Sequence, residues 1–292
     1  MAFANVTKIW KEASSIVLAN VKTRKILMLK RGSTAKFMPN SMVFPGGVVE
    51  DVDKKLGDPS RICALRELFE ESGILLTKDG FESSVDDGDL RAIKDNVKTD
   101  SNVFSKVAHK FSTDRLLDFE TFLTPATAAR RYYTKFFLGV LNEEPKVDLC
   151  TSEMSEYCWI DPIECVEQAF AEQFILPPPQ VYMLTRLSQI KNWEDCDKYC
   201  NQTPICPQPI HTETELIHNV FPGDHLYINN DCFVQPGRQM KLEELKILKT
   251  LPTHRVVYKK KPVYARCEVY MHNLKEEDAK KFHQFETHSK LL

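Results

Sequence analysis

Residues 66–74 have the sequence Arg66-Glu67-Leu68-Phe69-Glu70-Glu71-Ser72-Gly73-Ile74, and this stretch decides the expected fold and chemistry. On a helix, Glu67, Glu70 and Glu71 stand at i, i+3 and i+4, so their carboxylates share one face or its margin. Like charges that close destabilise a helix unless a cation lies among them. Hard divalent cations such as Mg²⁺ or Mn²⁺ prefer carboxylate and water oxygens. The helix alone therefore fits either a metal site or a solvated acidic surface.

The residues around this stretch predict where the helix begins and ends. Pro59-Ser60 is typical of a helix start, with Ser60 as the cap, and we expect the helix to run to about Ser72. Gly73 follows, where a helix end favours a residue in the left-handed region. Apolar side chains recur at helical spacing and predict one buried face: Ala64, Leu65, Leu68 and Phe69.

Short apolar runs on both sides of the helix predict the strands of a sheet. Before the helix they are residues 13–32, which predict two strands around a polar turn, and Ser41–Phe44, which ends at Pro45-Gly46-Gly47. After the helix they are the strand over 131–141 and the short strand Tyr157–Ile160. A helix is expected to start at Asp161-Pro162 and another to cover Gln180–Ile190.

The remaining segments are less regular. Residues 79–130 predict a helical insertion on the core sheet, with amphipathic helical spacing from Val103 to Phe122. Residues 191–240 are rich in Asn, Asp, Cys, Pro and Gly and predict mostly loops. A hairpin around Lys261-Pro262 and a helical tail from Lys275 are expected at the end of the chain. The basic run over 259–261 is interpreted as part of a solvated hairpin.

Composition excludes some classes of function. The chain has 292 residues, 42% hydrophobic and 27% charged, with a formal net charge of -2. That balance gives no general attraction to nucleic acid or to an acidic membrane surface. No stretch has the apolar length of a membrane span or a signal peptide. An anionic substrate must therefore be held by local cations or by metal ions.

Cysteine use and the last residues bear on the compartment. Nine cysteines without a leader indicate free thiols in a reducing compartment. Cys196, Cys200, Cys206 and His211 have a spacing that matches no strong zinc pattern. The chain ends Ser289-Lys290-Leu291-Leu292, one leucine beyond a peroxisomal address.

Gly47, Asp53 and the run from Arg66 to Ile74 together resemble the Nudix box, G-x5-E-x7-R-E-U-x-E-E-x-G-U with U aliphatic. The half from Arg66 to Ile74 matches at every specified position. The first half departs from the pattern, because Asp53 replaces a glutamate and twelve residues, instead of seven, separate it from Arg66. The resemblance implies an α/β (α+β) fold, the Nudix α/β/α sandwich with a mixed sheet. The core would cover 10–190, with the helical insertion at about 79–130, and 191–292 would form a loop-rich extension packed on it.

The resemblance also implies roles. Nudix enzymes hydrolyse a nucleoside diphosphate linked to another group, by attack of water at phosphorus. Glu67, Glu70 and Glu71 would hold Mg²⁺ or Mn²⁺ with the Gly47 carbonyl, and Arg66 would orient these carboxylates. Two sources of the general base stay open: Glu67, or the later Glu153 and Glu156, of which Glu156 is our candidate. These last two lie in a segment similar to the family's E-x-x-E-x-x-W-x-x-P run.

A narrower resemblance is carried by the run over 31–50, by Leu176-Pro-Pro-Pro-Gln180 and by Pro222-Gly-Asp224. These look like the animal group of nucleoside diphosphate-linked moiety X motif 19. The likeness extends over roughly 13–260. The group implies hydrolysis of coenzyme A and acyl-coenzyme A to 3',5'-ADP and phosphopantetheine species, in peroxisomes or mitochondria. An intracellular protein is expected, with the cytoplasm left open.

Candidate substrate-binding residues follow from this resemblance. Arg31, Lys36 and Arg131, with Arg130, are candidates to clamp a 3'-phosphate. Tyr132 or Tyr133 is a candidate to stack on adenine. Three alternatives stay open: hydrolysis of ADP-ribose, dinucleotides or RNA caps; a binding module with the fold and no turnover; and an α/β scaffold whose acidic helix is surface.

Overall fold

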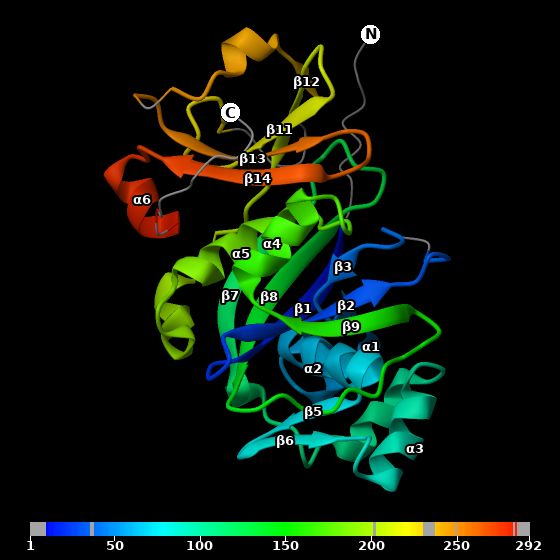
Figure 1. Cartoon of the computed structure of the whole chain (residues 1–292). Helices are drawn as coiled ribbons and strands as arrows, with labels where there is room; N and C mark the ends of the chain where they lie inside the picture. The colour runs from blue at the N-terminus through cyan, green and yellow to red at the C-terminus, as the bar shows by residue number, and fades with distance from the viewer. Residues whose placement is uncertain are drawn as a thin grey trace, which may run out of the picture.

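A central mixed sheet organises the chain (Figure 1). The computed structural model describes residues 10–35, 38–200, 203–229, 237–248, 250–282 and 284. The sheet has the order β3-β2-β1-β8-β7, with β4 paired to β1 and β9 paired to β2. Its strands are β1 (Lys11–Asn20), β2 (Lys25–Arg31), β3 (Met42–Val43), β4 (Gly46–Val48), β7 (Leu116–Leu123), β8 (Tyr132–Leu141) and β9 (Met154–Ile160).

Strand β1 is the axis of this sheet. It runs parallel to β8, from Lys11 opposite Tyr132 to Asn20 opposite Leu141, and antiparallel to β2 and β4. Its last eight residues, from Ala13 to Asn20, are all buried, as befits a strand covered on both faces. The mixed sheet that the sequence predicted is confirmed.

Helices cover both faces of the sheet. On one face lie α1 (Asp51–Leu56) and α2 (Pro59–Ser72), and apolar side chains of α2 pack against Ile16, Leu18 and Phe137. On the other face lie α4 (Pro162–Phe170) and α5 (Pro178–Gln189). The α/β/α sandwich expected from the sequence is therefore confirmed.

The caps of α2 fix where its acidic face begins. The helix spans the residues predicted, but its N-cap is Asp58, whose side chain accepts from the backbone N–H groups of Ser60 and Arg61, both at 3.0 Å. The choice of Ser60 as cap was wrong, because Pro59 fills the first helical position and leaves the cap to the residue before it. Gly73 ends the helix at φ 72°, in the left-handed region, as predicted.

The insertion is helical only in part. It begins with the hairpin β5 (Ile74–Thr77) and β6 (Gly80–Ser83), and continues with α3 (Gly88–Val97) and a 3₁₀ helix over Ser101–Val107. The helix expected over 103–122 is wrong, because most of its second half is β7, an edge strand paired with β8. A register shift between Asp118 and Glu120 changes the phase of burial along β7. A bulge of this kind lets Leu116, Phe119 and Phe122 all point inward, and that spacing imitates a helical period.

The last third of the chain forms a second sheet, in the order β12-β10-β11-β13-β14. Its strands are β10 (Gln208–His211), β11 (Leu216–Val220), β12 (Arg238–Gln239), β13 (Thr253–Lys259) and β14 (Ala265–His272). The expected hairpin is β13–β14, and the expected tail helix is α6 (Glu276–Phe282). The expectation of mostly loops over 191–240 is wrong for β10 and β11, because strands of four or five residues show too few periods to be recognised.

This C-terminal sheet packs on the core across α4 and α5 (Figure 1). One continuous apolar cluster joins Val17 and Phe122 of the core to Val256 and Met271 of the second sheet. At the junction, the Tyr182 hydroxyl and His254 Nε2 are hydrogen bonded at 3.0 Å. The two sheets therefore share a core.

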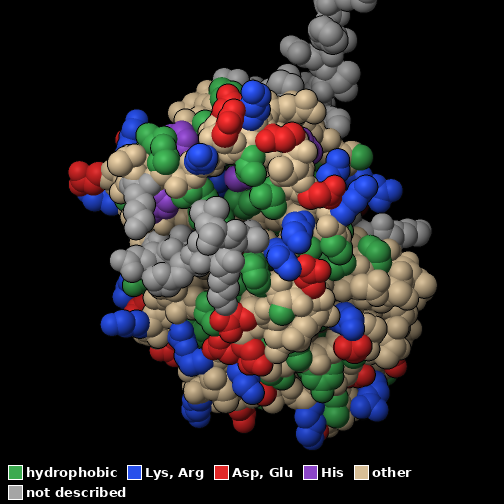
Figure 2. Space-filling view, turned by 45° about the horizontal axis from the view of Figure 1, so that its top comes forward, with side chains coloured by type: hydrophobic (Ala, Val, Ile, Leu, Met, Phe, Trp, Pro, Cys, Tyr) green, Lys and Arg blue, Asp and Glu red, His purple; other side chains and the backbone are tan. Residues whose placement is uncertain are grey.

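The surface agrees with the balanced composition. Figure 2 shows acidic and basic side chains interspersed over the face it presents. No helix within the described ranges is both long and apolar enough to cross a bilayer.

Candidate active site

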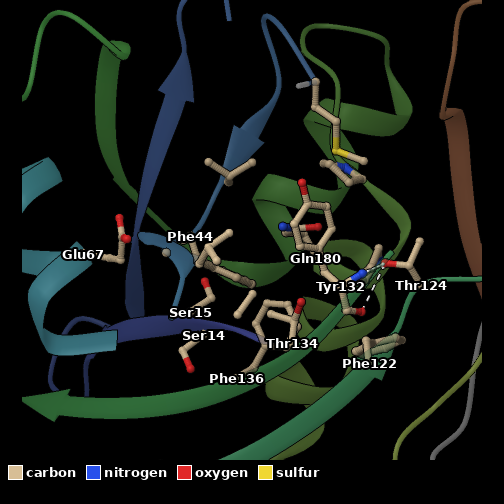
Figure 3. Close-up of a pocket in the computed structure, with 18 of the residues that line it drawn as sticks. Ser14, Ser15, Phe44, Glu67, Phe122, Thr124, Tyr132, Thr134, Phe136 and Gln180 are labelled. Carbon is tan, nitrogen blue, oxygen red and sulfur yellow. Dashed lines mark hydrogen bonds between the residues drawn. The ribbon is translucent and has the colours of Figure 1, made fainter. Parts of the chain in front are cut away.

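A cavity of about 960 Å³ lies between the acidic face of α2 and the C-terminal sheet. Its walls come from the start of β1, the end of β2, the Phe44–Val48 turn, α2, β8, the start of α5 and β11. In Figure 3, Glu67 lies on one side of the cavity and Phe122 and Thr124 lie on the other. All three glutamates of the Nudix-like stretch, Glu67, Glu70 and Glu71, line it.

The two glycines after Pro45 let the backbone lie directly against α2. A Cβ on Gly47 would collide with the Glu67 carboxylate, and a Cβ on Gly46 would stand 2.5 Å from the Ser14 carbonyl oxygen. Because no side chain intervenes, the Gly46 N–H donates to Glu71 Oε2 at 3.1 Å. The Gly47 carbonyl, a predicted metal ligand, accepts from the Cys63 thiol at 3.6 Å. These glycines are needed for close approach of the turn to the helix.

Arg66 lies behind the acidic face and is 1% exposed. Its Nη1 is 2.8 Å from Glu67 Oε1 and 3.4 Å from Glu70 Oε2, and its Nη2 donates to the Val48 carbonyl at 3.0 Å. A planar guanidinium with five donors in a fixed geometry holds several acceptors in place at once. Arg66 therefore contacts two of the three acids, and its orienting role stays a prediction.

Asp53 supplies the other half of this arrangement. It is fully buried and binds Arg66 through two contacts, Nε to Oδ1 at 2.9 Å and Nη2 to Oδ2 at 3.1 Å. Its Oδ2 also accepts from the Glu50 N–H at 2.8 Å, which caps α1. The extra residues between Asp53 and Arg66 are absorbed by the end of α1 and the turn into α2. The shorter acid and the longer spacing therefore still bring this carboxylate to Arg66.

The surroundings of the acidic face disfavour the charged form of its carboxyls. Burial raises the pKa of Glu67 to about 7, although Arg66 opposes the rise. Burial and the neighbouring Glu67 raise the pKa of Glu71 well above its ordinary value, and burial also raises the pKa of Glu70. A raised carboxyl pKa means that the surroundings disfavour the anion. A divalent cation would favour it, so the donor set fits such an ion.

The three glutamates do not form a ligand set for a metal ion by themselves. Within the described parts of the chain, no group of three or more His, Cys, Asp or Glu side chains is arranged so that it could hold a metal ion. Mg²⁺ is usually bound by one or two carboxylates, with waters and substrate phosphates completing its shell. One or two of Glu67, Glu70 and Glu71 could supply such carboxylate ligands, with waters and substrate phosphates as the others.

The predicted phosphate-binding cations fall in different places. Arg31, at the end of β2, lines the cavity, and its charge opposes the rise in the pKa of Glu71. Its buried Nε has no hydrogen-bond partner among the described residues. Arg131 is buried elsewhere, donating to the Thr124 carbonyl at 2.9 Å and packing over Trp10. Arg130 is exposed, and Lys36 lies outside the described residues. Of these four, Arg31 is the one seen to face the acids.

The two candidate general bases near β9 lie in different surroundings. Glu153 lines the cavity and its carboxylate is 3.0 Å from Lys98 Nζ. Glu156 is not among the lining residues; its side chain is 66% exposed and pairs with Lys30 at 3.0 Å. Glu156 lies within β9, in a run of three exposed residues over 155–157, whereas Glu153 stands just before the strand.

Several cavity residues were missed from the sequence. Lys98 comes from the end of α3, and nothing in the insertion's composition places that end beside the acids. Asn219 comes from β11, which was not recognised as a strand. Gln180 belongs to the Pro-rich stretch that marked the family group, and it lines the cavity at the start of α5. Tyr132 also lines the cavity, while Tyr133 stacks on Trp10 with ring centroids 6.3 Å apart.

Comparison with known proteins agrees with this geometry. The sequence model of the NUDT19 Nudix domain matches residues 58–187. The chain is 52% identical over 294 aligned positions to the Caenorhabditis elegans protein named "Putative nudix hydrolase 7", covering 100% of both chains. It is 27% identical over 323 positions to the human acyl-coenzyme A diphosphatase NUDT19, covering 81% of this chain and 86% of that protein.

A solved structure supports the fold. The Nudix hydrolase from Alicyclobacillus acidocaldarius superposes with a TM-score of 0.59 at 20% identity, covering 68% of this chain and 100% of that one. At this identity the likeness speaks for the fold alone.

Proposed function

The chain belongs to the Nudix hydrolases, in the NUDT19-like group, and from this premise we propose that it hydrolyses coenzyme A and acyl-coenzyme A at the diphosphate linkage. The products would be 3',5'-ADP and phosphopantetheine or its acyl derivative. One observation carries the proposal: Glu67, Glu70 and Glu71 line a single cavity, with Arg66 and Asp53 buried behind them.

We propose Mg²⁺ or Mn²⁺ as the cofactor, held by Glu67, Glu70 and Glu71 together with the Gly47 carbonyl. When bound, such an ion polarises phosphoryl oxygens and lowers the pKa of a coordinated water. The raised pKa values of the three carboxyls support this assignment, because burial disfavours their anions and a bound divalent cation would offset that effect.

Residues of the chain itself would bind the substrate, accept the proton and position the acids. Arg31 would bind an oxygen of the diphosphate, since it lines the same cavity as the acids and its charge acts on Glu71. Glu153 would accept a proton from the attacking water, with Lys98 holding its carboxylate in place at 3.0 Å. A new P–O bond forms to the water oxygen, and the bond from that phosphorus to the bridging oxygen breaks. The leaving phosphate departs as an anion. Arg66 acts as a positioning residue for Glu67 and Glu70.

The choice of substrate rests on the relatives and on the size of the cavity. The human, Xenopus laevis and Gallus gallus proteins similar to this chain carry the name acyl-coenzyme A diphosphatase. A cavity of about 960 Å³ stands near the upper end of the range typical of small-molecule sites, roughly 300–1,000 Å³. It has room for a substrate with a long group on the second phosphate.

A substrate panel tests the proposal. The purified protein is incubated with Mg²⁺ or Mn²⁺ and with coenzyme A, octanoyl-coenzyme A, ADP-ribose, diadenosine tetraphosphate or capped RNA, and the products are separated by chromatography. We expect 3',5'-ADP from both coenzyme A substrates at the highest kcat/KM of the panel, and no product when EDTA is present. Faster hydrolysis of ADP-ribose, dinucleotide or cap would replace the coenzyme A assignment. No hydrolysis of any compound would support a binding module that lacks turnover.

A further inference from the structure

The cavity has two ends of different chemistry. Its charged lining residues come from the core between Arg31 and Glu153, around the acidic face of α2. The residues contributed by the C-terminal sheet and its connections include no Lys, Arg, Asp or Glu within the described chain. A ligand that fills the cavity therefore carries its charge at the α2 end and is neutral toward the C-terminal sheet.

We name the neutral end the arm compartment, defined by six residues: Phe122, Gln180, Ile217, Asn219, Phe221 and Tyr258. Three of them, Ile217, Asn219 and Phe221, come from β11 or the residue directly after it. Ile217 and Asn219 alternate along β11 toward the cavity, while Val220 packs on the other side with Ile210 and Leu245. One short strand of the second sheet therefore forms much of this wall.

Two side-chain amides give the arm compartment its polarity. Asn219 is 6% exposed; its Nδ2 is 3.4 Å from the Tyr258 hydroxyl, and its buried Oδ1 has no partner among the described residues. The Oε1 of Gln180 is likewise buried without a described partner. Buried acceptors are nearly always hydrogen bonded in proteins, so a missing partner calls for a donor from a ligand or water. Both residues line the cavity, Gln180 on α5 and Asn219 on β11.

We propose that the arm compartment binds a neutral, amide-bearing chain attached to the hydrolysed diphosphate, with Asn219 and Gln180 accepting from its N–H groups and Ile217 and Phe221 packing on its apolar end. This inference rests on the proposed function and deepens it: the C-terminal sheet selects the group on the second phosphate. In coenzyme A that group is pantetheine, which has two amide N–H groups followed by the sulfur that carries an acyl chain. A sugar in this position would leave the apolar wall without a partner.

The test uses binding, so that it does not depend on turnover. The probe for the arm compartment is S-octanoylpantetheine, which has no phosphate, and the probe for the charged end is 3',5'-ADP. Each is titrated by calorimetry into the full-length wild-type protein and into Asn219→Leu, Gln180→Leu and Ile217→Trp. Leucine keeps the size of the amides and removes their hydrogen bonds, and tryptophan narrows the compartment. The matched controls are Gln239→Leu in β12 and Ile228→Trp, both at exposed positions outside the cavity.

We expect S-octanoylpantetheine to bind the wild type and both controls with the same Kd. Each of the three cavity variants should raise that Kd about tenfold or more, the scale of one lost hydrogen bond or a filled contact. The Kd for 3',5'-ADP should stay within about twofold, whereas a general loss of structure would weaken both probes. In the hydrolysis assay the same variants should raise the KM for octanoyl-coenzyme A far more than they change kcat.

An S-octanoylpantetheine Kd that is unchanged in all folded cavity variants, or no binding to the wild type, would overturn the inference. The three variants touch different elements, so failure of one to fold leaves the others to decide. The two proposals fail separately. Absence of hydrolysis with intact probe binding removes the enzyme assignment, and hydrolysis that is indifferent to the variants removes the arm compartment.

Discussion

Two buried Arg–Asp pairs stand in the two halves of the molecule and have nearly the same geometry. In the core, Arg66 holds Asp53 through contacts of 2.9 and 3.1 Å. In the C-terminal sheet, Arg255 holds Asp224 through contacts of 2.7 and 2.8 Å. All four side chains are at most 1% exposed.

The two pairs differ in the groups that the remaining N–H donors of each arginine contact. Arg66 Nη1 contacts the carboxylates of Glu67 and Glu70 at the cavity, whereas Arg255 Nη1 donates to the Leu245 carbonyl at 3.3 Å. Asp224 also accepts from the His254 N–H at 2.9 Å and so fastens β13 to the preceding turn. The Arg66–Asp53 pair therefore contacts the acidic face of α2, whereas the Arg255–Asp224 pair makes its other contacts with backbone groups. What a buried Arg–Asp pair holds in place therefore depends on the groups that surround it.

The largest effect should come from removing a charge on the acidic face. Glu71→Gln should lower kcat by about a thousandfold, since loss of a metal contact costs several kcal/mol at about 1.4 kcal/mol per tenfold. Because burial already raises the pKa of Glu71, the uncharged side chain should leave the melting temperature without metal equal or higher. Kinetics and thermal melts with and without Mn²⁺ measure both. A kcat within tenfold of wild type would remove Glu71 from the reaction.

The two pairs can be compared directly through Asp53→Asn and Asp224→Asn. Each leaves a buried arginine without its counter-charge, which costs roughly 3 kcal/mol of stability. Asp53→Asn should also lower kcat of the folded enzyme about tenfold or more, because Arg66 positions Glu67 and Glu70. Asp224→Asn should leave kcat within about twofold. Urea unfolding and kcat at low temperature separate the effects, and equal losses of kcat would refute the distinction.

Two glutamates near β9, outside α2, allow a second comparison, between a side chain that lines the cavity and one that does not. Glu153→Gln should lower kcat about a hundredfold, as expected for a lost general base. Glu156→Gln is the matched control and should change kcat by less than about twofold, since its side chain is 66% exposed and paired with Lys30. A larger effect at Glu156 would reverse the assignment.

The smallest effect concerns pH and the C-terminal sheet. Burial lowers the pKa of His254 to about 4, and its Nδ1 lies 2.7 Å from the Pro222 carbonyl oxygen. In the unfolded chain this imidazole takes up a proton near pH 6.5, whereas in the folded chain it does so only near pH 4, so the contribution of His254 to stability is constant above pH 6.5 and falls between those values. We expect His254 to contribute a loss of about 2 kcal/mol from pH 7.5 to pH 5, measured as the difference between wild type and variant in urea unfolding. His254→Gln should lose less over the same interval, and an identical slope would contradict the assignment.

The local sequence pattern was sufficient to predict the acidic helix α2. Glu67, Glu70 and Glu71 lie on one face because a helix has a fixed period, and Gly73 ends it because few other residues favour φ 72°. Strands β1, β2 and β8 are long enough to show their apolar character. Local pattern failed where it was interrupted or short: a register shift in β7 imitated a helix, and β11 has five residues.

The sequence by itself determined the long strands β1, β2 and β8 of the central sheet, the helix α2 and the set of acids on it, because these follow from patterns that extend over many residues. Only the tertiary structure decided that Asp53 reaches Arg66 across a longer loop, that Glu153 faces the cavity while Glu156 faces solvent, and that Asn219 closes its far end. These are contacts between segments distant in the chain. They depend on how the elements pack against one another, and no local pattern of residues specifies that packing.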